Sequence, residues 1–369
     1  MRIYSQSMLL TLRCMKQLKE KNNKAVAIWL LIGAGMIVIQ ILIGGITRLT
    51  ESGLSITEWN PVTGTLPPLN DMAWQVEFDK YRNTDQFRYV HQHFSLNDFK
   101  YIFFWEWFHR LWARLLGIVF LAGFLYFLVR RQFNKGMILP MIILFLLGGL
   151  QGAIGWLMVK SGLVPEKFYV GHVELTTHLI AALILLGYTL WFAYDLMPVM
   201  NKKVYNNSIN TIVKMLGVLL LLQLIYGGFM AGLKAAPMAP TWPDINGRFI
   251  PVTINELHPW WKNLSNNPLT VHFIHRGIAY LLVVAIIYFL LVSKNIPGKI
   301  FIHFRKLLFA LIVVQLLLGI ITVINSTNPG LLVWLGVTHQ FIAMLLVVCL
   351  VSLLYLVKRS PIKIIKQGG

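Results

Sequence analysis

The chain has 369 residues, of which 57% are hydrophobic and 13% are charged, and it carries a formal net charge of +19. A soluble protein of this size cannot bury so much apolar surface, so the composition excludes a soluble globular protein and indicates a polytopic membrane protein. The basic charge does not indicate nucleic-acid binding, because no basic stretch is interleaved with aromatic residues on a soluble module.

Apolar runs of about twenty residues, the length that crosses the hydrocarbon core of a bilayer, recur along the chain. They predict eight membrane helices, at 25–45, 107–129, 138–158, 172–194, 211–231, 270–292, 307–325 and 332–356. Each run is expected to be helical, because a spanning segment finds no water and has to satisfy its backbone internally. The predicted fold class is therefore all-α.

The distribution of Lys and Arg predicts the orientation of these helices. Basic residues concentrate before Ala25, after Leu356 and in the alternate connections, whereas the remaining loops carry equal numbers of basic and acidic residues. The positive-inside rule then places both termini in the cytoplasm of a bacterium, with the mitochondrial inner membrane as the alternative. The first apolar run is long enough to span and no cleavage site follows it, so we interpret it as an uncleaved helix.

The chain also divides into two similar halves. The predicted odd-numbered helices end in Gly-rich stretches after Gln or Leu, and the even-numbered helices begin with a histidine. We therefore predict two pseudo-repeated four-helix bundles with a shared ancestor. The predicted boundaries are a cytoplasmic N-terminal tail at 1–24, an N-terminal half at 25–200, a C-terminal half at 201–356 and a cytoplasmic C-terminal tail at 357–369.

Four histidines mark the starts of the even-numbered helices, within roughly two turns of the outer surface at 1.5 Å rise per residue. They are His109, His178, His275 and His339. Two histidines at one depth in a helix bundle can hold a haem iron from both sides, so the spacing predicts one pair in each half. A single buried histidine could instead be a packing residue, and His272 is a rival to His275 because the two share a helix face. Cys14 and Cys349 lie too far apart in depth for a disulfide.

Four stretches of the sequence carry motifs of a known family. They are Gly44-Gly45-Ile46-Thr47-Arg48-Leu49-Thr50-Glu51-Ser52-Gly53-Leu54-Ser55 with Glu58-Trp59, Glu106-Trp107-Phe108-His109-Arg110, Tyr226-Gly227-Gly228-Phe229-Met230-Ala231-Gly232-Leu233 with Thr241-Trp242-Pro243, and Thr338-His339-Gln340. Together they resemble the haem A synthase family, over nearly all of the chain after residue 25. The chain lacks a cysteine pair in its first outer loop, so it resembles the proteobacterial and mitochondrial branch.

The resemblance implies an oxidoreductase that converts the C8 methyl of haem O to a formyl group, giving haem A for terminal oxidases. It also implies a bound haem b (iron) as cofactor, haem O as substrate, and haem O synthase as the partner that supplies it. Further expected partners are membrane lipid and an electron acceptor that the sequence does not identify, and homo-oligomerisation is open.

The two halves differ at one chemically important position. Aligning them on His109 and His275 sets Glu106 opposite His272, so only the first half has a carboxylate beside an iron ligand. We therefore assign His109, His178 and the catalytic Glu106 to substrate haem O, and His275 and His339 to haem b. The alternative is that Glu106 is a solvated carboxylate at a helix start, where the helix dipole favours it.

Three arginines near the predicted pockets are candidates for binding haem propionates. They are Arg48, Arg110 and Arg276. A guanidinium group binds a carboxylate through two hydrogen bonds, although arginines at helix ends also reach toward lipid headgroups.

Two other functions fit parts of the pattern. A di-haem cytochrome b could transfer electrons from quinol without altering its haems, and extracted pigment would distinguish the two cases. A transporter fits poorly, because the predicted repeats are parallel and the mid-membrane depth is almost free of charge.

Overall fold

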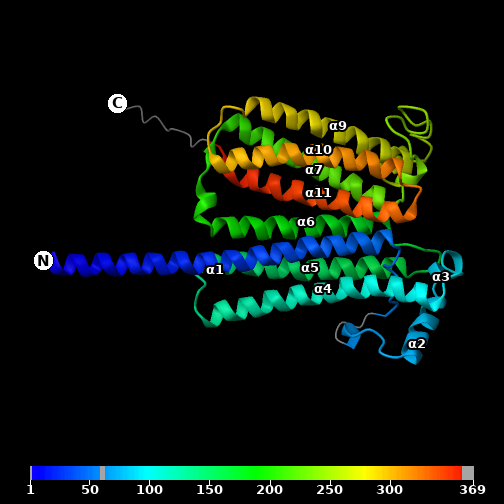
Figure 1. Ribbon diagram of the computed structural model, residues 1–369, viewed down its shortest axis with the longest axis horizontal. Coiled ribbons are helices and arrows are strands. Elements are labelled where there is room, and N and C mark those ends of the chain that lie inside the picture. The colour runs from blue at the N-terminus through cyan, green and yellow to red at the C-terminus, as the bar shows by residue number, and fades with distance from the viewer. Residues whose placement is uncertain (1, 59–62, 360–369) are drawn as a thin grey trace.

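The computed structural model describes residues 2–58 and 63–359, with side chains from residue 20 onward. Within these residues, eight helices are long and apolar enough to cross a membrane, and they run side by side (Figure 1). They are α1 (Arg2–Leu49), α4 (Leu96–Val129), α5 (Lys135–Gly162), α6 (His172–Asp195), α7 (Asn207–Gly232), α9 (Pro268–Val292), α10 (Lys299–Ile324) and α11 (Pro329–Leu356). The all-α membrane fold and all eight predicted spans are confirmed.

The helices of each half pack mainly with one another. In the first half α1 packs against α4 and α6, and α5 packs against α6; in the second half α7 packs against α9 and α11, and α10 packs against α9 and α11. The halves meet where α1 and α6 contact α11 and where α6 contacts α7. In the most apolar window of α6, 44% of residues are buried, compared with 6% in α4, so α4 lies at the edge of the protein.

One edge of the first half is less closed than its counterpart in the second. Among the described residues, α4 packs mainly against α1 and the loop helix α2, and its packing against α5 is slight at most. In the second half α9 and α10 pack together. The side of the first bundle between α4 and α5 is therefore the more open of the two.

The helix α4 begins earlier than predicted. It starts at Leu96 instead of 107, with a capping box formed by Ser95 and Asp98. Asp98 and Lys100 lower the hydropathy of this first part, which is why the apolar run in the sequence begins late. Glu106 consequently lies in the third turn of the helix. Its interpretation as a solvated carboxylate at a helix start was wrong.

Long loops and short helices cover the end of the bundle where α1 stops and α4 starts, which we call the loop end (Figure 1). The first loop contains η1 (Thr63–Thr65), α2 (Asp71–Arg82) and α3 (Asp85–Tyr89), and the second contains η3 (Ala236–Met238), η4 (Trp260–Lys262) and α8 (Asn263–Asn266). A cluster of aromatic side chains that includes Phe78, Tyr81, Phe99 and Phe103 packs the first loop onto α4.

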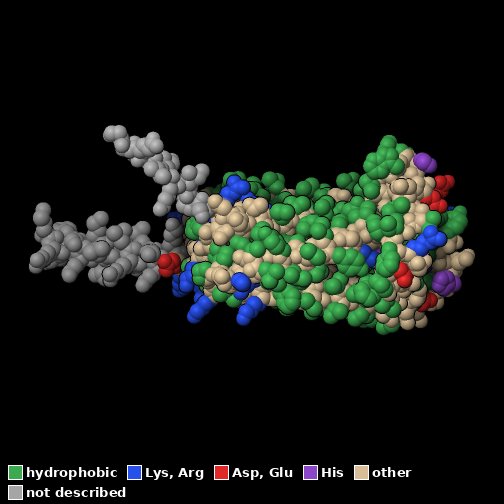
Figure 2. All heavy atoms as spheres, turned by 90° about the horizontal axis from the view of Figure 1, so that it is seen from above, with side chains coloured by type: hydrophobic (Ala, Val, Ile, Leu, Met, Phe, Trp, Pro, Cys, Tyr) green, Lys and Arg blue, Asp and Glu red, His purple; other side chains and the backbone are tan. Residues whose placement is uncertain are grey.

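The start of α1 and the end of α11 lie at the opposite end of the bundle, which we call the terminal end (Figure 1). There the connection between the halves contains η2 (Pro198–Asn201) and β1 (Val204–Tyr205), and β1 pairs in parallel with β2 (Val357–Lys358). Residues 2–24, predicted as a tail, continue α1 as a helix, while residues 360–369 of the predicted C-terminal tail lie outside the described residues. Apolar side chains cover the middle of the protein, and Lys and Arg gather at the terminal end (Figure 2).

Candidate functional site

The four predicted histidines lie inside the second, fourth, sixth and eighth membrane helices, which are α4, α6, α9 and α11. They form two pairs. His109 of α4 and His178 of α6 are close enough to interact electrostatically, and so are His275 of α9 and His339 of α11. Each pair belongs to one half of the chain. The imidazoles of each half thus share one region of an apolar bundle.

A glycine from the preceding helix lies against each of these rings. A Cβ atom added to Gly44 would lie 3.0 Å from the Cε1 atom of its histidine, and one added to Gly155 would lie 2.8 Å away. The corresponding distances are 3.4 Å at Gly227 and 3.1 Å at Gly319. Real Cβ atoms almost never come within 3.0 Å of another atom, so a side chain at Gly155 would force the His178 ring to move.

A glutamine lies one helical turn before each of these glycines and contacts the same histidine. The four glutamines are Gln40, Gln151, Gln223 and Gln315. Their amide nitrogens lie 3.1, 3.2, 3.2 and 3.1 Å from a ring nitrogen of His109, His178, His275 and His339, respectively. The sequence showed the glutamines and glycines, but the spacing did not reveal that they meet the histidines.

The ligand chemistry of these pairs fits a haem. No group of three or more His, Cys, Asp or Glu side chains that could hold a metal occurs among the described residues. Two imidazoles alone leave most coordination positions of a metal ion unfilled, whereas a porphyrin supplies the others from its own nitrogens. The glycines place no side chain against the Cε1 edges of the rings, and the Nδ1 atoms of His275 and His339 are buried without a hydrogen-bond partner.

Glu106 is buried and holds the first outer loop. It is 2% exposed, its Oε2 accepts hydrogen bonds from the Ser55 hydroxyl at 2.7 Å and the Ile56 amide at 2.9 Å, and its Oε1 accepts one from Arg110 at 2.6 Å. The carboxylate therefore joins α4 to the chain that follows α1. It lies three residues before His109, so it fixes this loop beside an expected iron ligand.

Arg110 and Arg276 hold equivalent loops in the two halves. Arg110 donates to the carbonyls of Ile56 and Glu58, which lie twelve and fourteen residues after Gly44. Arg276 donates to the carbonyls of Ala239 and Thr241, which lie twelve and fourteen residues after Gly227. Each guanidinium also bonds the residue four positions earlier, Glu106 or His272. Both arginines thus hold backbone in place, a role that the sequence did not reveal.

Arg48 lies between the two halves at the loop end. Its Nη2 donates to the carbonyl of Gly232 at 3.0 Å, and its guanidinium lies 5.9 Å from the ring centre of Tyr169. Its Nε is buried and has no hydrogen-bond partner among the described residues. Of the three arginines predicted to bind propionates, Arg48 therefore keeps an unused buried donor.

The remaining candidate histidine, His272, points to a different partner from His275. Its Nε2 accepts a hydrogen bond from Arg276 at 3.0 Å, and the side chain is fully buried. His275 instead contacts Gln223 and Gly227. The two residues share a helix face as expected, but only His275 interacts with His339.

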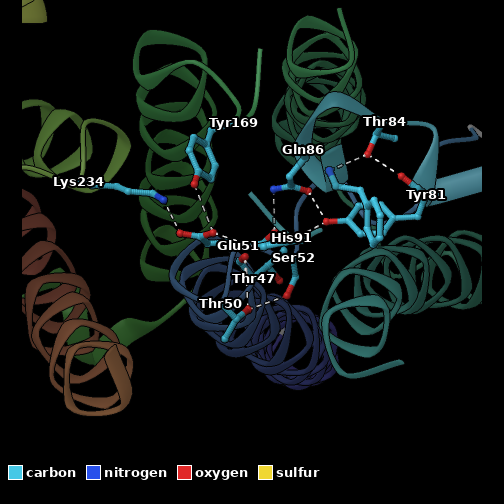
Figure 3. A network of polar contacts seen from close by, with 11 residues as sticks. Thr47, Thr50, Glu51, Ser52, Tyr81, Thr84, Gln86, His91, Tyr169 and Lys234 are labelled. Carbon is cyan, nitrogen blue, oxygen red and sulfur yellow. Dashed lines mark hydrogen bonds and ion pairs between the residues drawn. The ribbon is translucent and has the colours of Figure 1, made fainter. Parts of the chain in front are cut away.

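A polar network at the loop end connects the two halves through Glu51 (Figure 3). The carboxylate pairs with Lys234 and accepts a hydrogen bond from His91 Nε2 at 3.1 Å. His91 Nδ1 lies 2.6 Å from the hydroxyl of Tyr81, which donates to Gln86, and Gln86 donates back to the carbonyl of Glu51. The network therefore closes on itself. Its members are up to 183 residues apart, which is why sequence patterns missed it.

Two opposing effects set the pKa of Glu51. Burial raises it, but the hydrogen bonds and positive charges of His91 and Lys234 lower it more, and the result is a pKa of about 2. Glu51 is therefore an anion at neutral pH.

Comparisons with known proteins agree with the motifs. A family model described as cytochrome oxidase assembly protein matches residues 27–351. A "Heme A synthase" of Flavobacterium psychrophilum is 39% identical, covering 88% of this chain and 96% of that protein. A "Heme A synthase" of Bradyrhizobium sp. is 43% identical, covering 82% and 84%, and one of Parvibaculum lavamentivorans is 41% identical, covering 73% and 78%. The chain belongs to the cytochrome oxidase assembly protein family, together with these relatives.

Proposed function

We propose that this protein is a haem A synthase, an oxidoreductase that converts the C8 methyl of haem O to a formyl group for terminal oxidases. The observation that carries the proposal is the occurrence of one histidine pair in each half, in a chain of this family. Haem O would come from haem O synthase. The remaining parts of the proposal are a bacterial inner-membrane location, cytoplasmic termini and membership of the branch without the cysteine pair.

We further propose that the first half binds haem O and the second half holds haem b. His109 and His178 would be the axial ligands of the substrate, and His275 and His339 those of the cofactor. Haem b, when bound, supplies one-electron redox chemistry. Two differences between the halves support this assignment: the buried carboxylate of Glu106, and the more open side between α4 and α5. Haem O carries a long isoprenoid tail, which needs a route to lipid.

Glu106 would act beside the reacting methyl group. Its carboxylate is kept close to His109 by Ser55, Ile56 and Arg110, so its position does not depend on the substrate. An anion held there stabilises positive charge that develops during oxidation, and it can accept a proton. Arg48, with its unused buried Nε at the loop end, is the proposed contact for a propionate.

The test is the pigment content of purified protein from cells that make haem O. The wild type should contain haem b together with haem A or a partly oxidised product. His109→Ala and His178→Ala should retain haem b and convert no haem O, whereas His275→Ala and His339→Ala should lose haem b. Protohaem alone in the wild type, with no product under any supply of haem O, would instead indicate an electron-transfer cytochrome.

A further inference from the structure

All four glutamines that contact the histidines have the same unsatisfied atom. Each lies four residues before the glycine that packs against the same ring. The Oε1 atoms of Gln40, Gln151, Gln223 and Gln315 are buried and have no hydrogen-bond partner among the described residues. Buried polar atoms are nearly always hydrogen-bonded, and an unsatisfied one costs about 1–3 kcal/mol. The same unpaired oxygen therefore recurs at all four sites.

In the second half the histidine rings also contain an unpaired polar atom. The Nδ1 atoms of His275 and His339 are also buried without a partner, while Nε2 of each ring faces the amide nitrogen of its glutamine at 3.2 and 3.1 Å, respectively. Each glutamine–histidine pair thus contains one unused oxygen acceptor and one unused ring nitrogen. The two ends of a glutamine amide have nearly the same shape, and so have the two edges of an imidazole ring, so turning both groups over brings Oε1 to Nδ1 without repacking.

In the first half the amide nitrogen has a second anchor. Gln40 donates to the backbone carbonyl of His109 at 3.2 Å, and Gln151 donates to that of His178 at 3.1 Å. These bonds hold the amide beside the ring in a fixed place. Turning over either amide would break this second bond, so only Gln223 and Gln315 of the second half can exchange nitrogen for oxygen beside the ring.

A haem iron would require such an acceptor. An imidazole that gives the lone pair of one ring nitrogen to a metal carries its proton on the other nitrogen, and that N–H is normally hydrogen-bonded. We propose that Gln223 and Gln315 position the axial histidines, with each amide and each ring turned over so that Oε1 accepts a hydrogen bond from Nδ1–H. This inference rests on the proposed function, because it assumes that the histidines hold iron.

The acceptor has a measurable electronic effect. A hydrogen bond from Nδ1–H makes the imidazole a stronger donor to iron, which favours the ferric state and lowers the reduction potential. Gln223→Met keeps the length of the side chain and removes the acceptor, so it should raise the potential of haem b and weaken haem binding about 10–100-fold. Gln223→Glu keeps an acceptor and strengthens it, so it should shift the potential the other way. A role in packing alone would not give opposite signs.

The experiment is a spectroelectrochemical titration of haem b in the purified full-length protein, with the same two substitutions at Gln315. The expected change for Met is about tenfold in the ratio of reduced to oxidised haem, or 59 mV for a one-electron couple. Asn210→Leu is the matched control, because Asn210 is a buried amide on the same helix α7 with an unpaired Oδ1 and bonds Val357 instead of a histidine. It should leave the potential unchanged.

The outcomes separate this inference from the proposed function. If the wild type holds no haem with two histidine ligands, the proposed function fails. If it does, and the Met and Glu variants at both glutamines keep the wild-type potential or shift it in the same direction, only the glutamine inference is overturned. Should one variant fail to fold, the other substitution and the same substitutions at the second glutamine still give the direction in which the reduction potential shifts.

Discussion

Glu51 and Lys234 occupy equivalent positions in the two halves of the chain and pair with each other. Each lies seven residues after the glycine that contacts the first histidine of its half, and each has a left-handed backbone, with φ of 59° and 51°. Two identical charges would repel there, whereas the opposite charges of Glu51 and Lys234 attract.

Reversing this ion pair should preserve it. Glu51→Lys alone places two cations together and should destabilise the protein by between about 1 and 3 kcal/mol. The double variant Glu51→Lys/Lys234→Glu should recover part of the loss, because both positions have the same backbone conformation but His91 loses its acceptor. Thermal unfolding in detergent measures both effects. Equal stability of the single and double variants would contradict a direct interaction between these residues.

The stabilisation from Glu51 should depend on pH. Its pKa is lowered from 4.5 to about 2 in the folded protein, so the folded state favours the charged carboxylate. The contribution is therefore fully present above about pH 4.5 and is lost as the pH falls toward 2. Comparing the unfolding of wild type and Glu51→Gln should show a stability difference that is constant near neutral pH and shrinks over this acidic window. A difference that stays constant down to pH 2 would refute the lowered pKa.

Glu106→Gln should stop formation of haem A while haem b remains bound. The amide keeps the size of the side chain, but its nitrogen must face either Arg110 or the donors of Ser55 and Ile56, so one side of the contact is lost. Pigment extraction measures both haems. Glu256→Gln changes an exposed loop carboxylate and serves as the control, with normal conversion expected. Normal formation of haem A by the Glu106 variant would show that the reaction does not need this carboxylate.

Arg110→Lys and Arg276→Lys should each loosen only their own loop. Lysine cannot bond two alternate carbonyls as the guanidinium does. Hydrogen exchange near Ile56 should therefore rise about tenfold in the first variant and exchange near Thr241 in the second, which corresponds to about 1.4 kcal/mol. Mass spectrometry of the two peptides provides the measurement, and each variant is the control for the other. Faster exchange in both loops of either variant would indicate general destabilisation.

Gly155→Ala should disturb the first histidine pair. The added methyl group would lie 2.8 Å from the Cε1 atom of His178, so the ring has to move. Gly117→Ala is the matched control in a membrane helix, since its new methyl group meets no atom within 4 Å. The control should be as stable as the wild type or more so, because alanine favours helix by up to about 1 kcal/mol. Binding of haem O, followed by its absorption spectrum, should weaken only in the Gly155 variant.

The sequence by itself determined the membrane class, the eight helices and the histidines. Hydropathy is a local property, and the bilayer imposes a fixed length on each span, so these features can be recognised from short segments. Three glutamine–glycine pairs were also visible in the sequence, at Gln40, Gln223 and Gln315. In the third span the Gly-rich stretch that was noted begins at Leu147 and stops before Gly155, the glycine that contacts His178.

Only the tertiary structure decided how distant segments meet. Glu106 was predicted near a helix end, yet α4 extends past it and the chain after α1 covers it. The bonds from Arg110 and Arg276 to loop carbonyls came only from the structure, and their predicted contact with propionates stays a prediction. The pairing of Glu51 with Lys234 had no sequence signal, because an ion pair between residues 183 positions apart depends on the packing of the two halves and leaves no local pattern.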